Sequence, residues 1–498
     1  MKILRNMASL VILAAAFPAS GQGRVQAYLD SLSQTVPFAS ARMGVLAVKA
    51  GGDTVACLSP DKKITPASNV KLITTGLAMK ELGTDYRFQT KIGYSGAIEN
   101  GVLKGDLYII GGGDPSLASR DSIAPSEGSV FARWKALLTG AGINRIDGRI
   151  IGDGRYFDGE REHPSWLYED IGTYYGSGTS GLSYYRNQQD FKAVGGEKPG
   201  DPVKISPVYP DTPWMKYSYS CTTGKAGTGD LLFLYTSDLY PVGEVRGTFA
   251  VDKKPKTVEC SNKFPAYTCA FAFSKFLTDN NISSRGVAYV DSSSGKICPF
   301  PGERSDEDAA PSPAVIGSTR SPALGRMAYI VNHRSDNFYA ECLYREIGKT
   351  RTGSACYDSC RVAEKRILSS MGLAEGANLY DGSGLSRKNG VSPGFFCKFL
   401  RQMLYSPFFE SYLRTLTKPG EGSQAGRLRS ESAARRDRVR YKSGSMEGVR
   451  CYSGYVIPSD GGKDDTIIFS VMLDSYDGPL WMATSRIDRI IALIASEN

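Results

Sequence analysis

The stretch Pro66-Ala67-Ser68-Asn69-Val70-Lys71 places a hydroxyl and an amine three positions apart, where the sequence predicts the start of a helix. Apolar residues follow at helical spacing, and Gly83 is a suitable C-terminal stop. Side chains at i and i+3 of a helix lie about 5–6 Å apart at Cβ, so the Lys71 amine can reach the Ser68 oxygen. A serine needs an adjacent base to attack, and a desolvated lysine can serve as that base near neutral pH. The pair therefore predicts a serine nucleophile activated by a lysine.

Two more motifs of the same signature follow in the order that it requires. Ser335-Asp336-Asn337 fits S-x-N, and Lys442-Ser443-Gly444 fits K-[ST]-G, which accompany S-x-x-K in penicillin-recognising serine enzymes. The first precedes an apolar helical run, and the second ends the strand-like Val439-Arg440-Tyr441. Each motif alone is frequent by chance, but the three in this order and context indicate one site. The sequence thus predicts five catalytic residues: Ser68, Lys71, Ser335, Asn337 and Lys442.

Other letter matches to known motifs fail on physical grounds. Gly390-Val391-Ser392-Pro393-Gly394 matches G-x-S-x-G, but Pro393 has no N–H to give to an oxyanion hole. Gly111-Gly112-Gly113-Asp114 lacks the spacing of a phosphate-binding loop and predicts a tight turn instead. The chain has no C-x-x-C pair and only the histidines His163 and His333, so we expect no metal site and no cofactor.

The N-terminus has the pattern of a secretory signal peptide. Lys2 and Arg5 precede an uncharged run, and Ala19-Ser20-Gly21 resembles a small-residue cleavage site. The run is about half as long as a membrane span requires, so an N-terminal anchor is the less favoured alternative. We expect removal of residues 1–21 and export of the chain to the periplasm.

The charge balance favours an anionic polymer of the cell envelope over nucleic acid. The 498 residues carry a net charge of +9, which falls to +7 when Lys2 and Arg5 leave with the signal peptide. Basic residues occur throughout the chain, without a block of interleaved aromatics. We therefore expect no nucleic-acid partner.

Ten cysteines in an exported chain permit disulfides. Cys260 with Cys269, and Cys356 with Cys360, are close enough in sequence to pair, but the pairing cannot be deduced from spacing. Buried free thiols are an equally favoured alternative for Cys57 and Cys451, which lie in strand-like segments.

The two ends of the chain together predict one five-stranded sheet flanked by helices, in a mixed α/β fold. Two strands are expected before the Ser68 helix and three near the C-terminus: 43–50, 54–58, 439–443, 449–457 and 466–473. A final helix follows, with Ile487, Ile490, Ile491 and Ile494 on one face. This face could pack on the core or contact a membrane peripherally, and the charges of Arg486, Asp488 and Arg489 favour the core.

The middle of the chain does not belong to that sheet. Alternating apolar residues and turn signals recur from about residue 87 to about residue 305, and they predict β-rich inserted material. A polar, proline-rich segment at 301–313 would be the return linker. The expected organisation is a signal peptide, a catalytic domain formed by 22–86 and 306–498, and an insertion of 87–305.

At these motifs the chain resembles the D-alanyl-D-alanine carboxypeptidase/endopeptidase family, the class C low-molecular-mass penicillin-binding proteins of the DacB type. The resemblance extends over nearly all of the mature chain and includes segments outside the three motifs: Gly105-Asp106-Leu107, Gly112-Gly113-Asp114-Pro115, Gly148-Arg149-Ile150 with Asp153, Trp166 with Asp170, and the loop Asp381–Arg387. It implies a β-lactamase-like domain interrupted by two inserted domains. It also implies a periplasmic serine peptidase that acts on peptidoglycan stem peptides through an acyl-enzyme and is covalently inhibited by β-lactams.

The resemblance also implies roles for the site residues. Ser68 attacks, Lys71 is its base, Ser335 relays a proton beside a positive Lys442, and Asn337 binds the substrate amide. Substrate-binding roles would fall to Ser443, Gly444 and Ser445 in the K-[ST]-G strand, and to Asp170, Tyr175 and Arg387. Asp170 would read the free amine of a diamino acid and Arg387 the carboxylate at its other end.

Two departures from the family pattern affect substrate preference. Ser443 replaces the usual threonine and keeps the hydroxyl, whereas Glu447 adds a negative charge near the substrate. Two alternatives remain at this point: a β-lactamase of the same fold, which lacks support because no E-x-x-L-N is present, and a non-catalytic peptidoglycan-binding protein. Oligomeric state and the balance of carboxypeptidase and endopeptidase activity cannot be deduced from the sequence.

Overall fold

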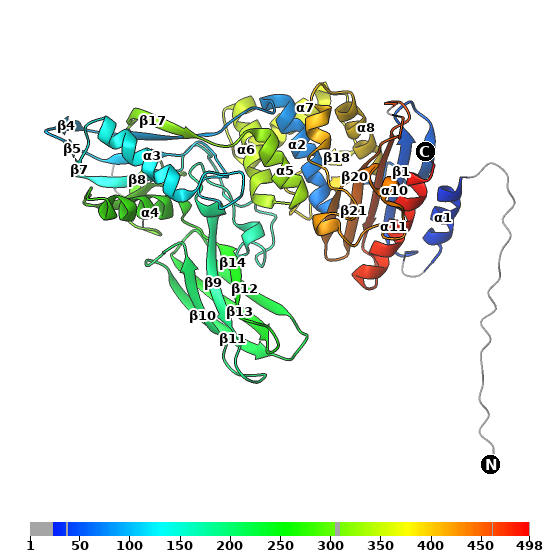
Figure 1. Ribbon diagram of the computed structural model, residues 1–498, viewed down its shortest axis with the longest axis horizontal. Helices are drawn as coiled ribbons and strands as arrows, with labels where there is room; N and C mark the ends of the chain where they lie inside the picture. The colour runs from blue at the N-terminus through cyan, green and yellow to red at the C-terminus, as the bar shows by residue number, and fades with distance from the viewer. Residues whose placement is uncertain (1–22, 36–37, 304–308, 461, 498) are drawn as a thin grey trace, which may run out of the picture.

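The computed structural model describes residues 23–35, 38–303, 309–460 and 462–497 (Figure 1). The expected signal peptide, residues 1–21, lies outside the described residues. No helix in the described ranges has the length and apolar character needed to cross a bilayer.

Strands from both ends of the chain form one five-stranded antiparallel sheet, in the order β2-β1-β22-β21-β20. The strands are β1 (Arg42–Lys49), β2 (Thr54–Leu58), β20 (Val439–Met446), β21 (Val449–Val456) and β22 (Ile467–Asp474). Pairing of β1 with β22 joins the N-terminal and C-terminal parts. The five-stranded sheet expected from the sequence is confirmed. Because β20 is an edge strand, Lys442 to Ser445 lie at the border of the sheet.

Helices cover both faces of this sheet (Figure 1). Successive side chains of a strand point to opposite faces, and along β22 Phe469 and Val471 join one apolar cluster while Ile468 and Met472 join the other. The first cluster includes α1 (Arg24–Ser33) and α11 (Leu480–Ala495).

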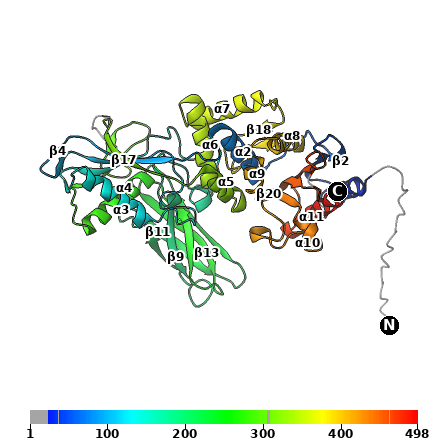
Figure 2. The ribbon, with the colours of Figure 1, turned by 45° about the horizontal axis from the view of Figure 1, so that its top comes forward.

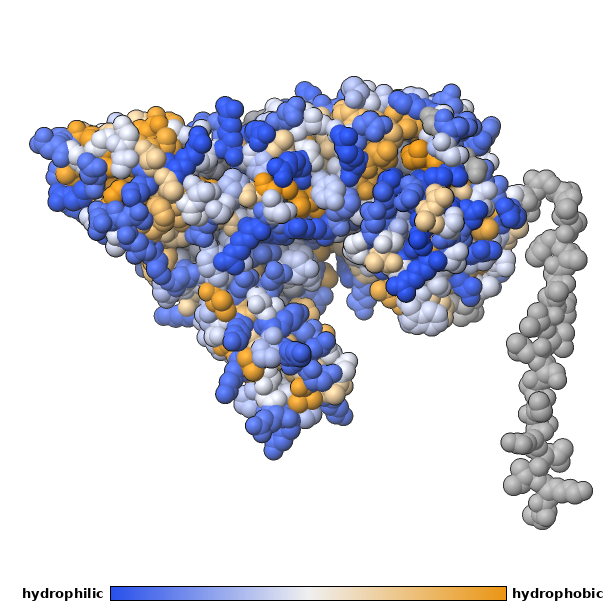
Figure 3. Space-filling model, in the orientation of Figure 1, coloured by the Kyte–Doolittle hydropathy of each residue, from blue (hydrophilic) through white to orange (hydrophobic). Residues whose placement is uncertain are grey.

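The α11 helix packs on the core, as its charged residues suggested. All four isoleucines of its apolar face are at most 1% exposed. Leu480 and Trp481, at its start, are among the exposed large apolar side chains. On the face shown in Figure 3, hydrophilic side chains predominate and apolar ones lie in separate small groups.

The second face of the sheet carries a helical layer that contains the Ser68 helix. Its core includes Leu72, Leu343, Phe399 and Met472. The elements of this part are η1 (Ala67–Asn69), α2 (Val70–Leu82), α5 (Leu324–His333), α6 (Asn337–Thr352), α7 (Tyr357–Ser370), β18 (Ala377–Asn378), β19 (Gly390–Val391), α8 (Pro393–Leu404), α9 (Phe409–Leu413), η4 (Gly422–Gln424) and α10 (Ala433–Arg436). As predicted, α2 ends at Gly83, whose φ of 87° suits a residue without a Cβ.

The inserted region contains a six-stranded sheet in the order β16-β15-β8-β6-β3-β17. Its strands are β3 (Gln89–Tyr94), β6 (Leu107–Ile110), β8 (Arg149–Asp153), β15 (Gly286–Val290), β16 (Ile297–Cys298) and β17 (Ala314–Arg320), and a small sheet of β4 (Ala97–Glu99), β5 (Val102–Lys104) and β7 (Arg145–Ile146) lies beside it. Strand β17 pairs with β3, so the inserted sheet extends past residue 305, the boundary expected from the sequence.

Two helices of this region, α3 (Glu127–Gly140) and α4 (Pro265–Asp279), were not predicted from strand alternation. Trp134 of α3 is fully buried and meets Phe273 of α4 edge to face, with ring centroids 5.2 Å apart. Local signals for both helices exist: the Ser126 side chain caps α3, and Pro265 occupies the first turn of α4.

Two three-stranded sheets project from the rest of the insertion, as Figures 1 and 2 show from two directions. One sheet has the order β10-β9-β14 and the other β11-β13-β12. Their strands are β9 (Gln188–Val194), β10 (Lys204–Tyr209), β11 (Lys216–Gly224), β12 (Asp230–Thr236), β13 (Val242–Ala250) and β14 (Lys256–Ser261), and they share a small apolar core. The short turns η2 (Tyr174–Gly176) and η3 (Tyr185–Asn187) lead into this part.

All ten cysteines lie in the described ranges, and the four of the two suggested pairs, Cys260, Cys269, Cys356 and Cys360, are free thiols there. The alternative of a buried free thiol holds for Cys451 but not for Cys57, which is partly exposed. Cys260, Cys269 and Cys360 are buried as well, whereas Cys356 is partly exposed.

Candidate active site

Ser68 and Lys71 meet at the start of the α2 helix. Ser68 lies in the single turn η1, and Lys71 is the second residue of α2. The Lys71 amine donates a hydrogen bond to Ser68 Oγ at 2.9 Å. Lys71 is fully buried, so its amine is held at the serine rather than in solvent. The contact expected from the S-x-x-K spacing is present.

The S-x-N motif reaches the same amine. Lys71 Nζ donates to Asn337 Oδ1 at 2.7 Å and to the Ser383 carbonyl at 2.6 Å. The Asn337 amide in turn donates to the Tyr175 carbonyl at 3.0 Å, which fixes the direction of its oxygen. Three hydrogen bonds from one buried amine thus bring Ser68, Asn337 and the 381–387 loop together.

The K-[ST]-G motif approaches from strand β20. Lys442 Nζ donates to Ser335 Oγ at 3.0 Å and to the Ser443 carbonyl at 2.6 Å. A Cβ on Gly444 would lie 2.4 Å from the Pro66 carbonyl oxygen and 3.1 Å from Ser68 N. Only glycine allows the strand to lie this close to the nucleophile's backbone.

Burial shifts the pKa of both lysines. It lowers the pKa of Lys71 to about 8, against the opposing effect of the Asp381, Asp336 and Glu341 carboxyl groups. It lowers the pKa of Lys442 well below its usual value, and the Lys71 charge acts in the same direction. A desolvated ammonium loses its proton more readily, so both amines become available as proton acceptors. The lowered pKa makes the neutral form of Lys442 accessible, where the resemblance implies a positive charge.

An ion-pair network from the insertion holds the S-x-N motif, and it was not predicted from the sequence. Asp336 accepts a hydrogen bond from the Tyr339 N–H at 2.9 Å, which caps α6, and forms an ion pair with Arg186. Asp121 pairs with Arg334 at 2.6 Å and accepts the Tyr339 hydroxyl at 2.7 Å. Both carboxylates are buried, so these bonds fix the geometry of a turn in which Ser335 has a φ of 56°.

The loop 381–387 is held by hydrogen bonds within the loop and by hydrogen bonds to Trp166 and Glu341. Asp381 accepts the N–H groups of Gly384 at 2.9 Å and Ser386 at 2.6 Å, and the Trp166 indole at 2.8 Å. Ser383 makes two backbone hydrogen bonds: its N–H donates to Glu341 at 2.7 Å, and its carbonyl accepts from the Lys71 amine. The loop therefore positions the base, a role the sequence did not assign to it.

A cavity of about 370 Å³ opens over this network. It brings together six of the residues predicted from the sequence: Ser68, Asn337, Ser445, Asp170, Tyr175 and Arg387. Its other lining residues are Glu169, Tyr174, Gly384, Leu385, Met446 and Glu447. The remaining predicted residues are not among its lining residues: Lys71, Ser335, Lys442, Ser443 and Gly444. Lys71 contacts Ser68 and Asn337 of the lining, and Gly444 lies close to Ser68 N. Lys442 contacts Ser335 and Ser443.

Asp170 and Tyr175 form one side of the cavity. The Tyr175 hydroxyl donates to Asp170 Oδ1 at 3.1 Å, and burial raises the pKa of Asp170. Arg387 is exposed and close enough for its charge to oppose that shift. The carboxylate of Asp170 and the guanidinium of Arg387 therefore belong to residues that line the same cavity as Ser68.

No group of three or more His, Cys, Asp or Glu side chains in the described part of the chain is placed to hold a metal ion. The chemistry that these residues can perform is nucleophilic attack by a serine, with lysine amines and a second serine as proton carriers.

Comparison with protein families gives one match over most of the chain. The model of the D-Ala-D-Ala carboxypeptidase 3 (S13) family matches residues 25–491. The D-alanyl-D-alanine carboxypeptidase of Actinomadura sp. (strain R39) is 26% identical over 477 residues, covering 91% of this chain and 82% of the relative. The D-alanyl-D-alanine carboxypeptidase DacB of Haemophilus influenzae is 24% identical over 431 residues, covering 84% of this chain and 82% of the relative.

Solved structures give the same fold. The crystal structure of penicillin binding protein 4 (dacB) from Haemophilus influenzae superimposes with a TM-score of 0.76 at 22% identity, covering 95% of this chain and 98% of that one. The structure of that protein complexed with a novel β-lactam has a TM-score of 0.71 at 21% identity and covers 94% of this chain and 98% of that one. The expected β-lactamase-like architecture with a large insertion is confirmed.

Proposed function

The chain belongs to the D-Ala-D-Ala carboxypeptidase 3 (S13) family, and from this premise we propose that Ser68, Lys71, Ser335, Asn337 and Lys442 carry its reaction. It is a serine-type D-Ala-D-Ala carboxypeptidase, as the resemblance in its motifs implied. The observation that supports the residue assignment is the set of hydrogen bonds from the buried Lys71 amine to Ser68 and Asn337.

In the acylation step, neutral Lys71 accepts the Ser68 proton while Oγ attacks the carbonyl of the penultimate D-alanine. The pKa of about 8 supports this role because a useful fraction of the amine is neutral near pH 7. We assign the oxyanion hole to the backbone N–H groups of Ser68 and Ser445. The close approach of Gly444 to Ser68 N supports this pairing, and one such donor contributes about 3–4 kcal/mol to transition-state stabilisation.

Departure of the terminal D-alanine requires a proton on its nitrogen. Ser335 Oγ, which accepts a hydrogen bond from Lys442, is placed to relay that proton. Because the pKa of Lys442 is lowered, we assign it the role of a proton donor and acceptor behind Ser335 rather than of a fixed charge. The proton that Lys71 took from Ser68 passes to the Ser335–Lys442 pair and replaces the one given to the departing amine, so Lys71 is neutral again when water attacks the ester. Lys71 then accepts the proton of the water and returns it to Ser68 Oγ as the ester bond breaks.

We further propose that the substrates are peptidoglycan stem peptides. Ser443 would bind the terminal carboxylate, Asp170 with Tyr175 the free amine of a diamino acid, and Arg387 the carboxylate at its other end. The placement of Asp170, Tyr175 and Arg387 around one cavity with Ser68 supports this interpretation. Glu447 lines the same cavity and adds a negative charge, which favours substrates with a free amine over amidated or acidic ones.

The same attack on a cross-linking D-alanyl bond gives endopeptidase activity, and the same attack on a β-lactam gives a stable acyl-enzyme.

We propose that the chain acts in the periplasm, with the signal-peptide pattern of residues 1–21 in support. We also propose that the catalytic domain is interrupted between η1–α2 and α5, and that the insertion ends after Arg320 because β17 pairs with β3.

The function is tested by incubating the chain from residue 22 with purified muropeptides and following their masses. Loss of a terminal D-alanine shows carboxypeptidase activity, and separation of cross-linked dimers shows endopeptidase activity. Both should disappear in Ser68→Ala. If masses stay unchanged while the protein retains peptidoglycan, it is a binding protein. Multiple turnover of a penicillin without peptide cleavage would assign it as a β-lactamase.

A further inference from the structure

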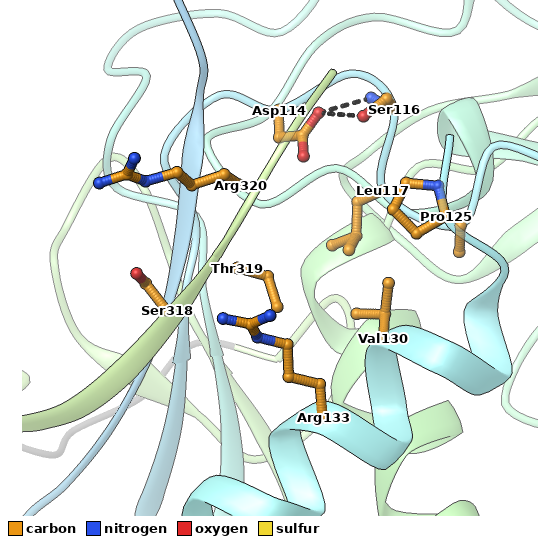
Figure 4. Close-up of a pocket in the computed structure, with 10 residues that line it drawn as sticks. Asp114, Ser116, Leu117, Pro125, Val130, Arg133, Ser318, Thr319 and Arg320 are labelled. Atoms are coloured by element: carbon orange, nitrogen blue, oxygen red, sulfur yellow. Dashed lines mark hydrogen bonds between the residues drawn. The ribbon is translucent and has the colours of Figure 1, made fainter. Parts of the chain in front are cut away.

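A second cavity, of about 480 Å³, lies in the inserted region between β17, the α3 helix and the segment 114–125 (Figure 4). It shares no lining residue with the cavity at Ser68. Its volume falls in the range of small-molecule sites, about 300–1,000 Å³. The lining residues are Asp114, Ser116, Leu117, Ala118, Pro125, Val130, Arg133, Ser318, Thr319 and Arg320.

One end of this cavity holds a buried carboxylate that lacks a cation. Asp114 is 7% exposed, and its Oδ1 accepts the Ser116 N–H at 2.8 Å and the Ser116 hydroxyl at 2.6 Å. No described residue donates a hydrogen bond to its Oδ2 or forms an ion pair with it, and Figure 4 shows this oxygen directed away from Ser116. Burial raises the pKa of Asp114 to about 6, so the group is ionised at neutral pH. A buried, unpaired carboxylate is costly unless a cation or hydrogen-bond donors reach it.

Arg133 of α3 approaches the cavity from the opposite side. In Figure 4 its guanidinium points up from the helix toward Thr319. Arg133 is exposed and has no hydrogen-bond or ion-pair partner among the described residues. It forms no ion pair with Asp114, so the two opposite charges stay apart across the space.

Apolar side chains form the wall between these charges. Leu117, Ala118 and Val130 are each at most 5% exposed, which shows that the hollow is bounded by the packed interior. The cavity therefore offers an anion, a short apolar surface and a cation in turn, and a second exposed guanidinium, that of Arg320, also lines it. That order is complementary to a small molecule with an ammonium group, small apolar side chains and a carboxylate.

We propose that this cavity is a second binding site for a small zwitterion of the amino-acid or dipeptide class, with its ammonium at Asp114 and its carboxylate at Arg133. The site is separate from the catalytic cavity and rests on none of the catalytic assignments. Charge-assisted hydrogen bonds at both ends would supply most of the specificity.

Calorimetric titration with D-alanyl-D-alanine tests the proposal, with the Ser68→Ala chain from residue 22 so that the peptide is not consumed. We expect saturable binding that weakens about 10-fold or more in Asp114→Asn and in Arg133→Gln. The side-chain oxygen introduced by Asp114→Asn would still accept both hydrogen bonds of Ser116, and Arg133 is exposed, so these variants keep the fold; melting temperatures check this. The matched control is Asp170→Asn, which alters the carboxylate of the catalytic cavity and should leave the affinity unchanged.

Analogues test each charge separately. N-acetyl-D-alanine lacks the ammonium group and D-alaninamide lacks the carboxylate, so each should bind about 10-fold or more weakly than D-alanine, and L-alanine shows whether the site distinguishes enantiomers. Absence of saturable binding up to millimolar concentrations would overturn the proposal. Binding that is unaffected by both cavity substitutions, or lost only in Asp170→Asn, would also overturn it.

Discussion

The rate of acylation should follow the ionisation of Lys71. Burial lowers the pKa of this amine to about 8. Only the neutral amine can accept the Ser68 proton, so acylation should rise with pH and level off once most of the lysine is neutral. A lysine with a pKa of about 8 is about 1% neutral at pH 6 and about 90% neutral at pH 9, which predicts a rise of about 90-fold with a plateau above about pH 9.

An unperturbed lysine would behave differently. With its usual pKa of 10.5, the same change of pH would raise the neutral fraction about 1000-fold and give no plateau. The assay is stopped-flow acylation by a fluorescent penicillin under single-turnover conditions, so that hydrolysis of the ester does not contribute. Lys80→Arg, an exposed position on the same helix, should keep the wild-type profile, whereas Lys71→Arg should be almost inactive throughout. A rate independent of pH between 6 and 9, or one still rising tenfold per pH unit at pH 9, would refute the assignment of a desolvated lysine base.

Three further substitutions test other parts of the site. Asp170→Ala should lower kcat/KM for peptides with a free side-chain amine by about 10–100-fold, about 1.4–2.8 kcal/mol, and leave penicillin acylation nearly unchanged; equal losses on both substrates would mean that Asp170 supports the fold. Arg186→Met removes the ion-pair partner of the buried Asp336, so it should lower the melting temperature and slow acylation about 10-fold or more. The control Arg285→Met removes an exposed ion pair and should change neither quantity measurably. An unaltered acylation rate in Arg186→Met would contradict a positioning role for Arg186. Gly444→Ala would place a Cβ 2.4 Å from a backbone oxygen and should slow acylation about 100-fold or more, while Gly128→Ala, which has open space around it, should retain the wild-type rate.

The parts of the site that were predictable from the sequence are those set by local spacing. Ser68 and Lys71 meet because i and i+3 share a helical face, and Asp336 caps α6 because an aspartate precedes an apolar helical run. The sheet was predictable because its strands carry long apolar runs between clear turns. Chain order then linked the three motifs to one family, and with it to one fold.

Contacts between distant segments were not predictable in this way. Arg186 lies in a turn of three consecutive residues with positive φ, and its pairing with Asp336 depends on how the insertion packs on α6. The hydrogen bond from the Ser383 N–H to Glu341 likewise depends on tertiary packing, since Glu341 lies within α6 and no sequence motif links it to the 381–387 loop. The lowered pKa of Lys442 was not predictable for a related reason, because its desolvation is a property of the assembled site. The pairing of β17 with β3, which brings one more strand after the proline-rich segment into the inserted sheet, was likewise not deducible from local pattern.

The most direct test of the central claim is the mass of the protein after exposure to benzylpenicillin, followed by peptide mapping. We predict a single penicilloyl adduct on the peptide that contains Ser68, and no adduct in Ser68→Ala. An adduct on any other residue, or covalent labelling that persists in Ser68→Ala, would contradict the account.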